Sequence, residues 1–208
     1  GPRRVSAYFV PMLIANMCAG TIAIRYGCKG AALPAVTACA SGSNAIGEAV
    51  RAIRHGYADA MITGGAEAAV NELSVAGFIN MQALTVSEDP DAASLPFDKR
   101  RGGFVMGEGG AALVLEEYEH ARARGAVIFG EICGYGSTCD AYHITAPRPD
   151  AEGGVNAMVQ ALREAGYRYG ESIYINAHGT GTPLNDPMET LAVKKALGEE
   201  AARRARIS

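Results

Sequence analysis

Short apolar segments alternate with helix-like segments along most of this sequence, and that alternation limits the folds open to it. The apolar segments that we expect to form strands are residues 33–37, 60–63, 111–115, 127–134 and 172–177. The segments with helical periodicity are residues 12–26, 44–55, 76–83, 118–124, 153–165 and 188–197. Strands separated by helices are typical of a layered α/β fold with a mostly parallel or mixed sheet.

The composition excludes some classes of partner. The chain has 208 residues, of which 49% are hydrophobic and 20% charged, with a formal net charge of −3. We expect no nucleic-acid partner, because Arg203, Arg204 and Arg206 are best explained as a solvated helix end. We expect no membrane segment either, because residues 12–24 are too short to span a bilayer and are better explained as a buried helix.

The five cysteines point to free thiols. They form no Cys-x-x-Cys pair and have no histidine at zinc-ligand spacing, so we expect no metal site. An odd number of cysteines is typical of reduced thiols and therefore of a cytoplasmic protein. We expect Cys18 and Cys133 to be small buried residues, and Cys28 and Cys139 to lie near turns.

One cysteine occupies a position that suits a nucleophile. Cys39 follows the apolar segment 33–37 and precedes the predicted helix 44–55, whose apolar residues are Ile46, Val50 and Ile53. Unpaired N–H groups and the positive end of the helix dipole favour a thiolate at such a junction. Small neighbours leave the sulfur approachable. On this segment alone, a structural cysteine and a catalytic one are about equally supported.

A histidine at the end of another predicted strand favours the catalytic interpretation. His178 follows the apolar run 172–177 and precedes the sequence Gly-Thr-Gly-Thr. Glycines allow close approach of a ligand to the backbone, and threonine hydroxyls bind polar groups. A cysteine and a histidine at two strand ends can carry out thioester chemistry.

These segments resemble the β-ketoacyl-acyl carrier protein synthases. Residues 37–42 (TACASG) are similar to the family's nucleophile motif, and residues 176–183 (NAHGTGTP) to its first-histidine motif. The intervening matches are residues 64–67 (GGAE), 96–100 (PFDKR), 102–109 (GGFVMGEG) and 140–145 (DAYHIT). The last is typical of the type II elongating enzymes, and the resemblance covers essentially the whole chain.

The resemblance implies a thiolase-like fold, with two similar halves stacked as α/β/α/β/α layers. Residues 1–120 would form the C-terminal part of the first half and residues 121–208 the start of the second. Family members are about twice as long, so we expect this chain to be an internal fragment that is inactive alone. The missing part would carry a lysine, a second histidine and a Gly-Phe loop.

The resemblance also implies decarboxylative condensation of an acyl chain with malonyl-acyl carrier protein, as in fatty acid elongation. Cys39 would carry the acyl chain as a thioester, and His178 would stabilise the malonyl enolate. Acyl carrier protein would be the partner of a homodimeric enzyme that needs no cofactor. Two alternatives stay open: a non-catalytic chain-length subunit, and a thiolase-type Cys–His acyltransferase.

Five further residues would contact the substrate by resemblance. Thr180, Thr182 and Thr145 would line the tunnel for the phosphopantetheine arm. Phe78 would form a wall of the acyl pocket, and Phe9 would reach toward the partner subunit. The residue types by themselves also fit simpler roles, because threonine hydroxyls close turns and phenylalanines fill cores.

Three polar residues are predicted to support the site. Asp186 and Glu189 flank Pro187 at the start of the predicted helix 188–197, where they match a capping box and are expected mainly to cap the helix. In the family, an acidic pair at these positions shapes the network around the active site. By the same resemblance, Asn176 matches a residue of a structural cation site.

Overall fold

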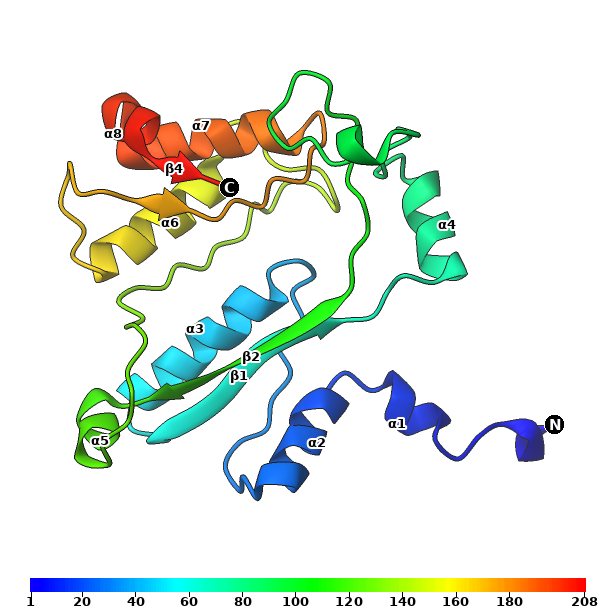
Figure 1. Ribbon diagram of the computed structural model, residues 1–208. Coiled ribbons are helices and arrows are strands. Elements are labelled where there is room, and N and C mark those ends of the chain that lie inside the picture. The colour runs from blue at the N-terminus through cyan, green and yellow to red at the C-terminus, as the bar shows by residue number, and fades with distance from the viewer. The chain divides into compact units, whose positions relative to one another are not determined.

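The computed structural model describes residues 1–208, which divide into two compact units. Unit 1 comprises residues 1–66 and 110–129, and unit 2 comprises residues 67–109 and 130–208. Figure 1 shows both units in one ribbon. None of the helices combines the length and the apolar character that crossing a membrane requires.

The α-helices and strands occur in both units. The helices are α1 (Phe9–Leu13), α2 (Met17–Tyr26), α3 (Ser41–Arg54), α4 (Glu72–Asn80), α5 (Tyr118–Ala123), α6 (Glu152–Glu164), α7 (Asn185–Leu197) and α8 (Glu199–Arg204). The strands are β1 (Ala60–Glu67), β2 (Gly109–Glu116), β3 (Tyr174–Ile175) and β4 (Arg206–Ile207). Short 3₁₀ helices cover Pro2–Arg4 and Pro90–Ala92.

Unit 1 is organised by the paired strands β1 and β2. The backbone N–H of Glu117 donates to the carbonyl of Asp59, and Ala66 lies beside Gly110, so the two strands run in opposite directions. A Cβ on Gly64 would lie 2.1 Å from the carbonyl oxygen of Ala111. Glycine is therefore required for the strands to approach this closely.

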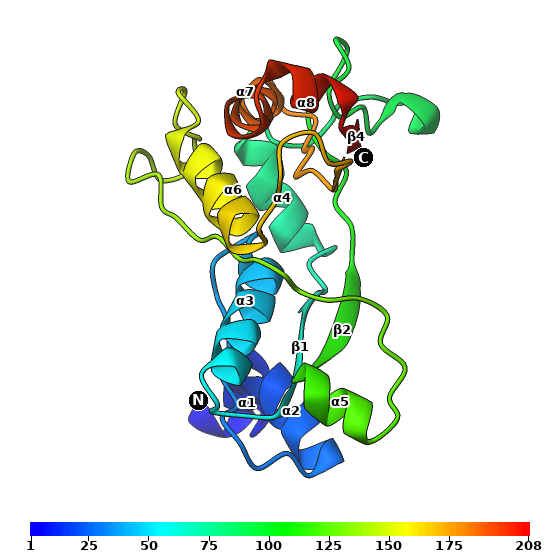
Figure 2. The same cartoon turned by 90° about the vertical axis from the view of Figure 1, so that its left-hand side faces the viewer.

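Helix α3 lies along the β1–β2 pair in both views (Figures 1 and 2). Its buried residues are Gly47, Ala49 and Val50. Of the predicted apolar residues, Val50 is therefore buried, whereas Ile46 and Ile53 are half-buried. A Cβ added to Gly65 on β1 would lie only 3.4 Å from the Cα of Gly42, so β1 also packs against the start of this helix. The helix begins three residues earlier than the apolar pattern predicted.

Three expectations for secondary structure are wrong. The single helix predicted for residues 12–26 is two helices, because Ile14 is extended and Asn16 is the N-cap of α2. Asparagine is unfavourable inside a helix. Residues 33–37 and 127–134 do not form strands. An extended segment becomes a strand only beside a second strand, and these segments have none in this structure.

The last residue of the second segment and the two residues after it lie along α6 instead. Cβ atoms on Gly134 or Gly136 would collide with the backbone of α6, at Ala161 and Ala157 respectively. The backbone N–H of Tyr135 donates to the Glu164 side chain over 3.1 Å. Side chains on this helix therefore accept hydrogen bonds from backbone N–H groups that would pair with a neighbouring strand in a sheet.

Helix α7 is the centre of unit 2. It packs against α6 and α8 (Figure 1). Its residues Val193 and Leu197 form a buried cluster with Ala201 of α8, and Met158 and Leu162 of α6 pack against this cluster. Burial of such side chains stabilises each by roughly 1.5–3 kcal/mol relative to exposure.

Strands β3 and β4 form a parallel pair in unit 2. Tyr174 lies opposite Arg206, and Ile175 lies opposite Ile207. Hydrogen bonds with Ser208 and then with Asn176 lower the pKa of Tyr174. The apolar pattern predicted a strand over residues 172–177, of which β3 forms the middle, but it predicted neither α8 nor β4.

An ion cluster joins the end of β2 to α5. Arg124 approaches the carboxylate of Glu116 to 2.6 Å, and the ring of His120 contacts the same carboxylate. Hydrogen bonds from Arg124 and then from His120 lower the pKa of Glu116 to about 2, from an ordinary value of 4.5. The cluster therefore requires an ionised Glu116.

The first prediction concerns the approach of β2 to Gly64. We expect Gly64→Ala to lower the free energy of unfolding by about 3 kcal/mol, because the new methyl group would force the strands apart. Gly20→Ala is the matched control: it lies in α2 with nothing within 4 Å of its added Cβ, and it should raise stability by about 0.5–1 kcal/mol. Urea unfolding of the full-length protein measures both. Equal effects of the two substitutions would contradict the prediction.

The second prediction concerns pH. Because folding lowers the pKa of Glu116 from 4.5 to about 2, its contribution to stability is fully present above pH 4.5 and is lost as the pH falls toward about 2. We expect Glu116→Gln to lower the melting temperature near neutral pH, and this difference from wild type to shrink across that window. Glu48→Gln, which removes an exposed pair with Arg51, serves as control. A difference from wild type that stays constant with pH would refute the assignment.

Candidate active site

A tight turn in unit 1 carries Cys39. Ala38 has a φ of 53°, in the left-handed region that non-glycine residues rarely adopt. The Ser41 hydroxyl donates to the carbonyl of Ala38 over 2.7 Å and accepts from the N–H of Thr37 over 2.9 Å. The Thr37 hydroxyl in turn donates to Asn44 over 2.7 Å. Polar side chains of α3 therefore hold the turn in its strained conformation.

This turn places Cys39 one residue before the N-cap of α3. Ala40 is the N-cap, and the sulfur of Cys39 is exposed. The first turn of a helix leaves backbone N–H groups without intrahelical partners, so a negative charge developing there is stabilised. The structure thus agrees with the position that the sequence predicted for Cys39.

Two carboxylates on α7 bind the loop that carries His178 in unit 2. Glu189 accepts from the backbone N–H groups of His178, over 2.7 Å, and Gly179, over 2.9 Å. Asp186, whose exposed fraction is only 2%, accepts from the N–H of Phe97 over 2.6 Å and of Gly181 over 3.1 Å. Backbone groups from two separate segments therefore converge on one end of α7.

The expectation that Asp186 and Glu189 mainly cap α7 is wrong. The N-cap is Leu184, whose own side chain makes no capping hydrogen bond. Asp186 is instead the second residue of the helix, and its carboxylate accepts hydrogen bonds from the loops that contain Phe97 and Gly181. Backbone N–H groups of those loops need partners, and the two acidic side chains supply them.

The same loop is also bound through its carbonyl groups. The N–H of Gly103 donates to the carbonyl of Gly181 over 2.9 Å, and Arg101 donates to the carbonyl of Thr182 over 3.2 Å. Gly179 and Gly181 have φ angles of 51° and 68°. A β-carbon is disfavoured at such angles, which explains the glycines of this motif.

The structure brings Thr180 and Thr182 together. Their hydroxyl oxygens lie 2.9 Å apart, and the hydroxyl of Thr182 accepts from the backbone N–H of Asn185 over 3.3 Å. Both side chains are half-buried. The two hydroxyls therefore form one polar group beside the backbone of His178.

Thr145 lies in a turn organised by another histidine. The ring nitrogen Nδ1 of His143 accepts from the N–H groups of Thr145, over 3.2 Å, and Ala146, over 3.0 Å. Thr145 itself is exposed. Its hydroxyl is thus accessible, but no contact joins it to the loop of Thr180 and Thr182.

The predicted aromatic residues have different environments. Phe78 on α4 makes an edge-to-face contact with Phe104, with ring centroids 5.3 Å apart. Phe9 begins α1 and is 51% exposed. Asn176, beside β3, hydrogen-bonds Tyr174 and is exposed.

The predicted site residues are divided between the two units. Unit 1 holds Cys39 and Phe9, and unit 2 holds Phe78, Thr145, Asn176, His178, Thr180, Thr182, Asp186 and Glu189. Of these, the structure joins His178, Thr180, Thr182, Asp186 and Glu189 in one hydrogen-bonded network.

Three members of this network were not predicted. Asn185 donates to both Asp186 and Glu189 over 3.2 Å, Phe97 donates its backbone N–H to Asp186, and Arg101 binds the carbonyl of Thr182. A polar residue next to Asp186 was a usable signal for Asn185. Phe97 lies in the matched segment 96–100, but nothing local marks Phe97 or Arg101 as partners of Asp186 and Thr182, which are 89 and 81 positions away.

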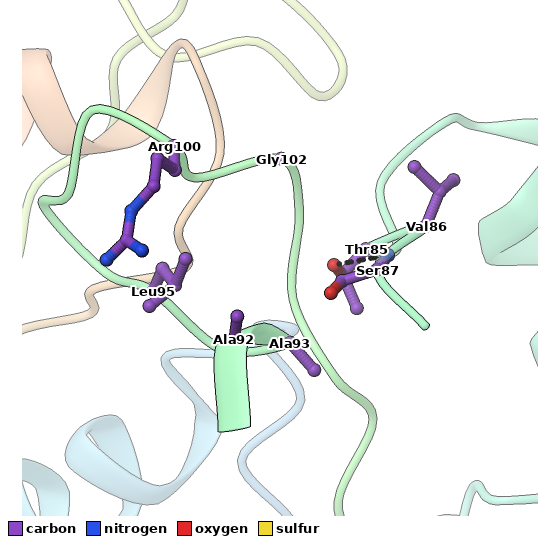
Figure 3. Close-up of a pocket in the computed structure, with 8 residues that line it drawn as sticks. All are labelled: Thr85, Val86, Ser87, Ala92, Ala93, Leu95, Arg100 and Gly102. Carbon is purple, nitrogen blue, oxygen red and sulfur yellow. Dashed lines mark hydrogen bonds between the residues drawn. The ribbon is translucent and has the colours of Figure 1, made fainter. Parts of the chain in front are cut away.

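Unit 2 also contains a hollow of about 270 Å³, shown in Figure 3. The lining residues are Thr85, Val86, Ser87, Ala92, Ala93, Leu95, Arg100 and Gly102. The guanidinium of Arg100 is paired with Asp98 at 3.0 Å, which lowers the pKa of Asp98 to about 2. None of the predicted site residues lines this hollow, so it is separate from the His178 network.

The burial expected for two cysteines is wrong. Cys18 on α2 and Cys133 are exposed, as are Cys28, Cys39 and Cys139. Exposure therefore does not distinguish Cys39 from the other thiols. Its position before the start of α3 distinguishes it.

The architecture and the two motifs agree with one class of protein, the thiolase-like α/β ketosynthases. Residues 1–121 match the family model "Beta-ketoacyl synthase, N-terminal domain", and residues 129–208 match "Beta-ketoacyl synthase, C-terminal domain". The chain therefore belongs to the β-ketoacyl synthase family.

Curated relatives of the chain are named 3-oxoacyl-[acyl-carrier-protein] synthase 2. The protein of that name from Synechocystis is 56% identical over 97% of this chain, and the one from Staphylococcus aureus is 52% identical over 97%. These matches cover 49% and 50% of the relatives. The chain thus spans about half the length of the curated relatives it matches.

Solved structures confirm the fold class. A ketosynthase in complex with its type II polyketide acyl-carrier protein is 36% identical, with a TM-score of 0.94 over 99% of this chain and 51% of that one. A β-ketoacyl synthase from Burkholderia phymatum is 38% identical, with a TM-score of 0.86 over 94% of this chain and 47% of its own.

The third prediction concerns the buried carboxylate of Asp186. We expect Asp186→Asn to lower the free energy of unfolding by about 3 kcal/mol, because an amide would direct N–H groups at the N–H donors of Phe97 or Gly181. Glu199→Gln, which alters an exposed acidic residue next to α7, should cost about 0.5 kcal/mol or less. Urea unfolding of the full-length protein compares the two. A loss for Asp186→Asn no larger than that control would contradict the burial argument.

Proposed function

We propose that this chain supplies the nucleophile and the first histidine of an elongating β-ketoacyl-acyl carrier protein synthase. The observation that carries the proposal is the intact turn that presents Cys39 one residue before the N-cap of α3. The loop of His178 adds support, because its backbone is bound on two sides. Residues 1–120 and 121–208 then belong to successive halves of a longer enzyme.

In the first step, the thiolate of Cys39 attacks the carbonyl carbon of an acyl thioester on acyl carrier protein. A carbon–sulfur bond forms to Cys39, and the phosphopantetheine thiol of the carrier leaves as a thiolate. Negative charge develops on the carbonyl oxygen in the transition state. In this proposal the backbone N–H of Cys39, at the start of the turn into α3, donates a hydrogen bond to that oxygen.

In the second step, a malonyl thioester on a second carrier loses carbon dioxide. The electron pair of the broken carbon–carbon bond forms an enolate, whose oxygen accepts a hydrogen bond from the ring of His178. The enolate carbon then attacks the thioester carbonyl on Cys39, and the Cys39 thiolate is released. The product is a β-ketoacyl chain two carbons longer.

The other predicted residues are assigned to the substrate. Thr180 and Thr182, whose hydroxyls lie 2.9 Å apart, bind the phosphopantetheine arm beside His178, together with Thr145. Phe78 forms part of the acyl pocket, and Asn176 supports the strand end that carries the histidine. Asp186 and Glu189 hold the backbone of the loop.

Acyl carrier protein is the proposed partner, and the enzyme is proposed to be a cytoplasmic homodimer. The carrier is consistent with the solved ketosynthase complex that this chain resembles. The dimer is consistent with α1, where Phe9 is 51% and Met12 81% exposed. An apolar helix this exposed fits a surface that a second subunit covers.

The alternative of a non-catalytic chain-length subunit is less favoured. One solved relative is a ketosynthase/chain length factor, 38% identical over 95% of this chain. Such subunits usually lose the nucleophile, whereas this chain keeps Cys39 in a strained turn. A thiolase-type acyltransferase is less favoured because the loop after His178 and residues 140–145 match the carrier-dependent synthases.

The fourth prediction tests the reaction in the complete enzyme. Acyl-carrier protein should transfer its acyl group to wild type and to His178→Ala, but not to Cys39→Ala, as measured by intact-protein mass. His178→Ala should lower condensation with malonyl carrier by about 10²-fold or more, the effect of losing a donor to a developing oxyanion. His120→Ala is the matched control and should condense at the wild-type rate.

Three outcomes would refute the proposal. An acyl group found on Cys133 or Cys139 would remove Cys39 as the nucleophile. A wild-type enzyme that accepts the acyl group but releases no carbon dioxide from malonyl carrier would favour an acyltransferase of the thiolase type. A complete enzyme that cannot be acylated at all would favour the chain-length subunit.

A further inference from the structure

Two adjacent arginines in unit 2, Arg100 and Arg101, carry the same charge but have different surroundings. The side chain of Arg100 is 71% exposed and pairs with Asp98. The side chain of Arg101 is only 21% exposed and is directed toward the loop that follows His178. The second arginine is therefore placed to act on that loop, and the first provides a natural comparison.

Arg101 binds two consecutive carbonyls of the loop. Its Nε donates to the carbonyl of Thr182 over 3.2 Å, and one Nη donates to the carbonyl of Pro183 over 3.5 Å. Its other Nη donates to the carbonyl of Asp98 over 3.1 Å. A guanidinium has five N–H donors in one rigid plane, so a single side chain can join these two segments.

A third carbonyl of the loop is bound by a neighbour of Arg101. Gly103 donates its N–H to the carbonyl of Gly181 over 2.9 Å, so residues 101–103 bind three successive carbonyls. The N–H groups of the same loop are bound by Asp186 and Glu189. With both sides of the backbone bound, the backbone positions of Thr180 and Thr182 are restrained, and their hydroxyls contact each other over 2.9 Å.

The charge of Arg101 adds a second effect. Its Nε lies 3.8 Å from the buried carboxylate of Asp186. Asp186 otherwise receives only neutral donors, namely the backbone N–H groups of Phe97 and Gly181 and the amide of Asn185. Removal of the cation would leave a buried anion without a counter-charge, which strongly destabilises its position.

We propose that Arg101 is a positioning residue that sets the orientation of Thr180 and Thr182 for the phosphopantetheine arm of the malonyl carrier. This inference rests on the proposed function, which assigns that arm to this loop. Arg101 acts through the loop backbone and does not touch the substrate. It therefore affects the malonyl step, which uses His178, more than the loading of Cys39.

The fifth prediction compares three variants of the complete enzyme. Arg101→Gln should raise the KM for malonyl carrier about tenfold, the effect of roughly one lost hydrogen bond to a charged group. Its rate of Cys39 acylation should stay within about twofold of wild type. Arg101→Lys should not restore the KM, because an ammonium is a point charge that cannot bind the same set of carbonyls. Arg100→Gln should resemble wild type.

Hydrogen exchange gives a second readout that does not require turnover. In Arg101→Gln, the backbone amides of residues 178–185 should exchange about tenfold faster, because the lost contacts lower the cost of local opening. Amides within α6 should be unchanged, which serves as the control for intact folding.

The outcomes are distinguishable. Arg101→Gln that matches Arg100→Gln in both KM and exchange would overturn the assignment while leaving the proposed function intact. Equal losses of Cys39 loading and condensation, with faster exchange in α6, would show a general loss of structure and would also overturn it. A wild-type enzyme that does not condense malonyl carrier would remove the proposed function, and this assignment with it.

Discussion

The hydrogen bonds from loop backbone to the carboxylates of Asp186 and Glu189 determine the geometry of unit 2. The loop that carries His178 has left-handed glycines, so its N–H groups cannot pair in a regular ladder. They need other acceptors, and α7 provides two. Because α7 is held in turn by the core of Val193 and Leu197, the packing of three helices is transmitted to the position of the histidine.

This arrangement uses one helix end for two purposes. The N-terminal turn of a helix favours negative charge, which reduces the cost of burying Asp186. The same carboxylate accepts from segments that are distant in sequence, at Phe97 and Gly181. Arg101 then provides a cation at 3.8 Å and binds the carbonyl side of the loop. The network is thus supported by charge and by directed hydrogen bonds together.

Unit 1 presents its reactive residue by a different means. The turn at Cys39 is short and depends on local contacts, since Ser41 and Asn44 of α3 bind the backbone and hydroxyl of residues just before them. Longer-range support comes from glycines, because Gly64 permits the approach of β2 and Gly65 permits the approach of β1 to α3. The lack of a side chain at these two glycines is therefore as important here as the polar contacts.

The α/β class, the family, helices such as α3, α6 and α7, and the local turn of Cys39 could be predicted from the amino-acid sequence, because each depends on residues close together in the chain. The three-dimensional arrangement sets the partners of Asp186 and Glu189: their spacing matches a capping box, yet their partners lie in loops, and Phe97 is 89 positions from Asp186. It also decided that residues 33–37 and 127–134 are not strands, because strand formation requires a neighbour that no local pattern specifies. Arg101 belongs to the same category, since only folding brings its guanidinium to carbonyls 81 and 82 positions away.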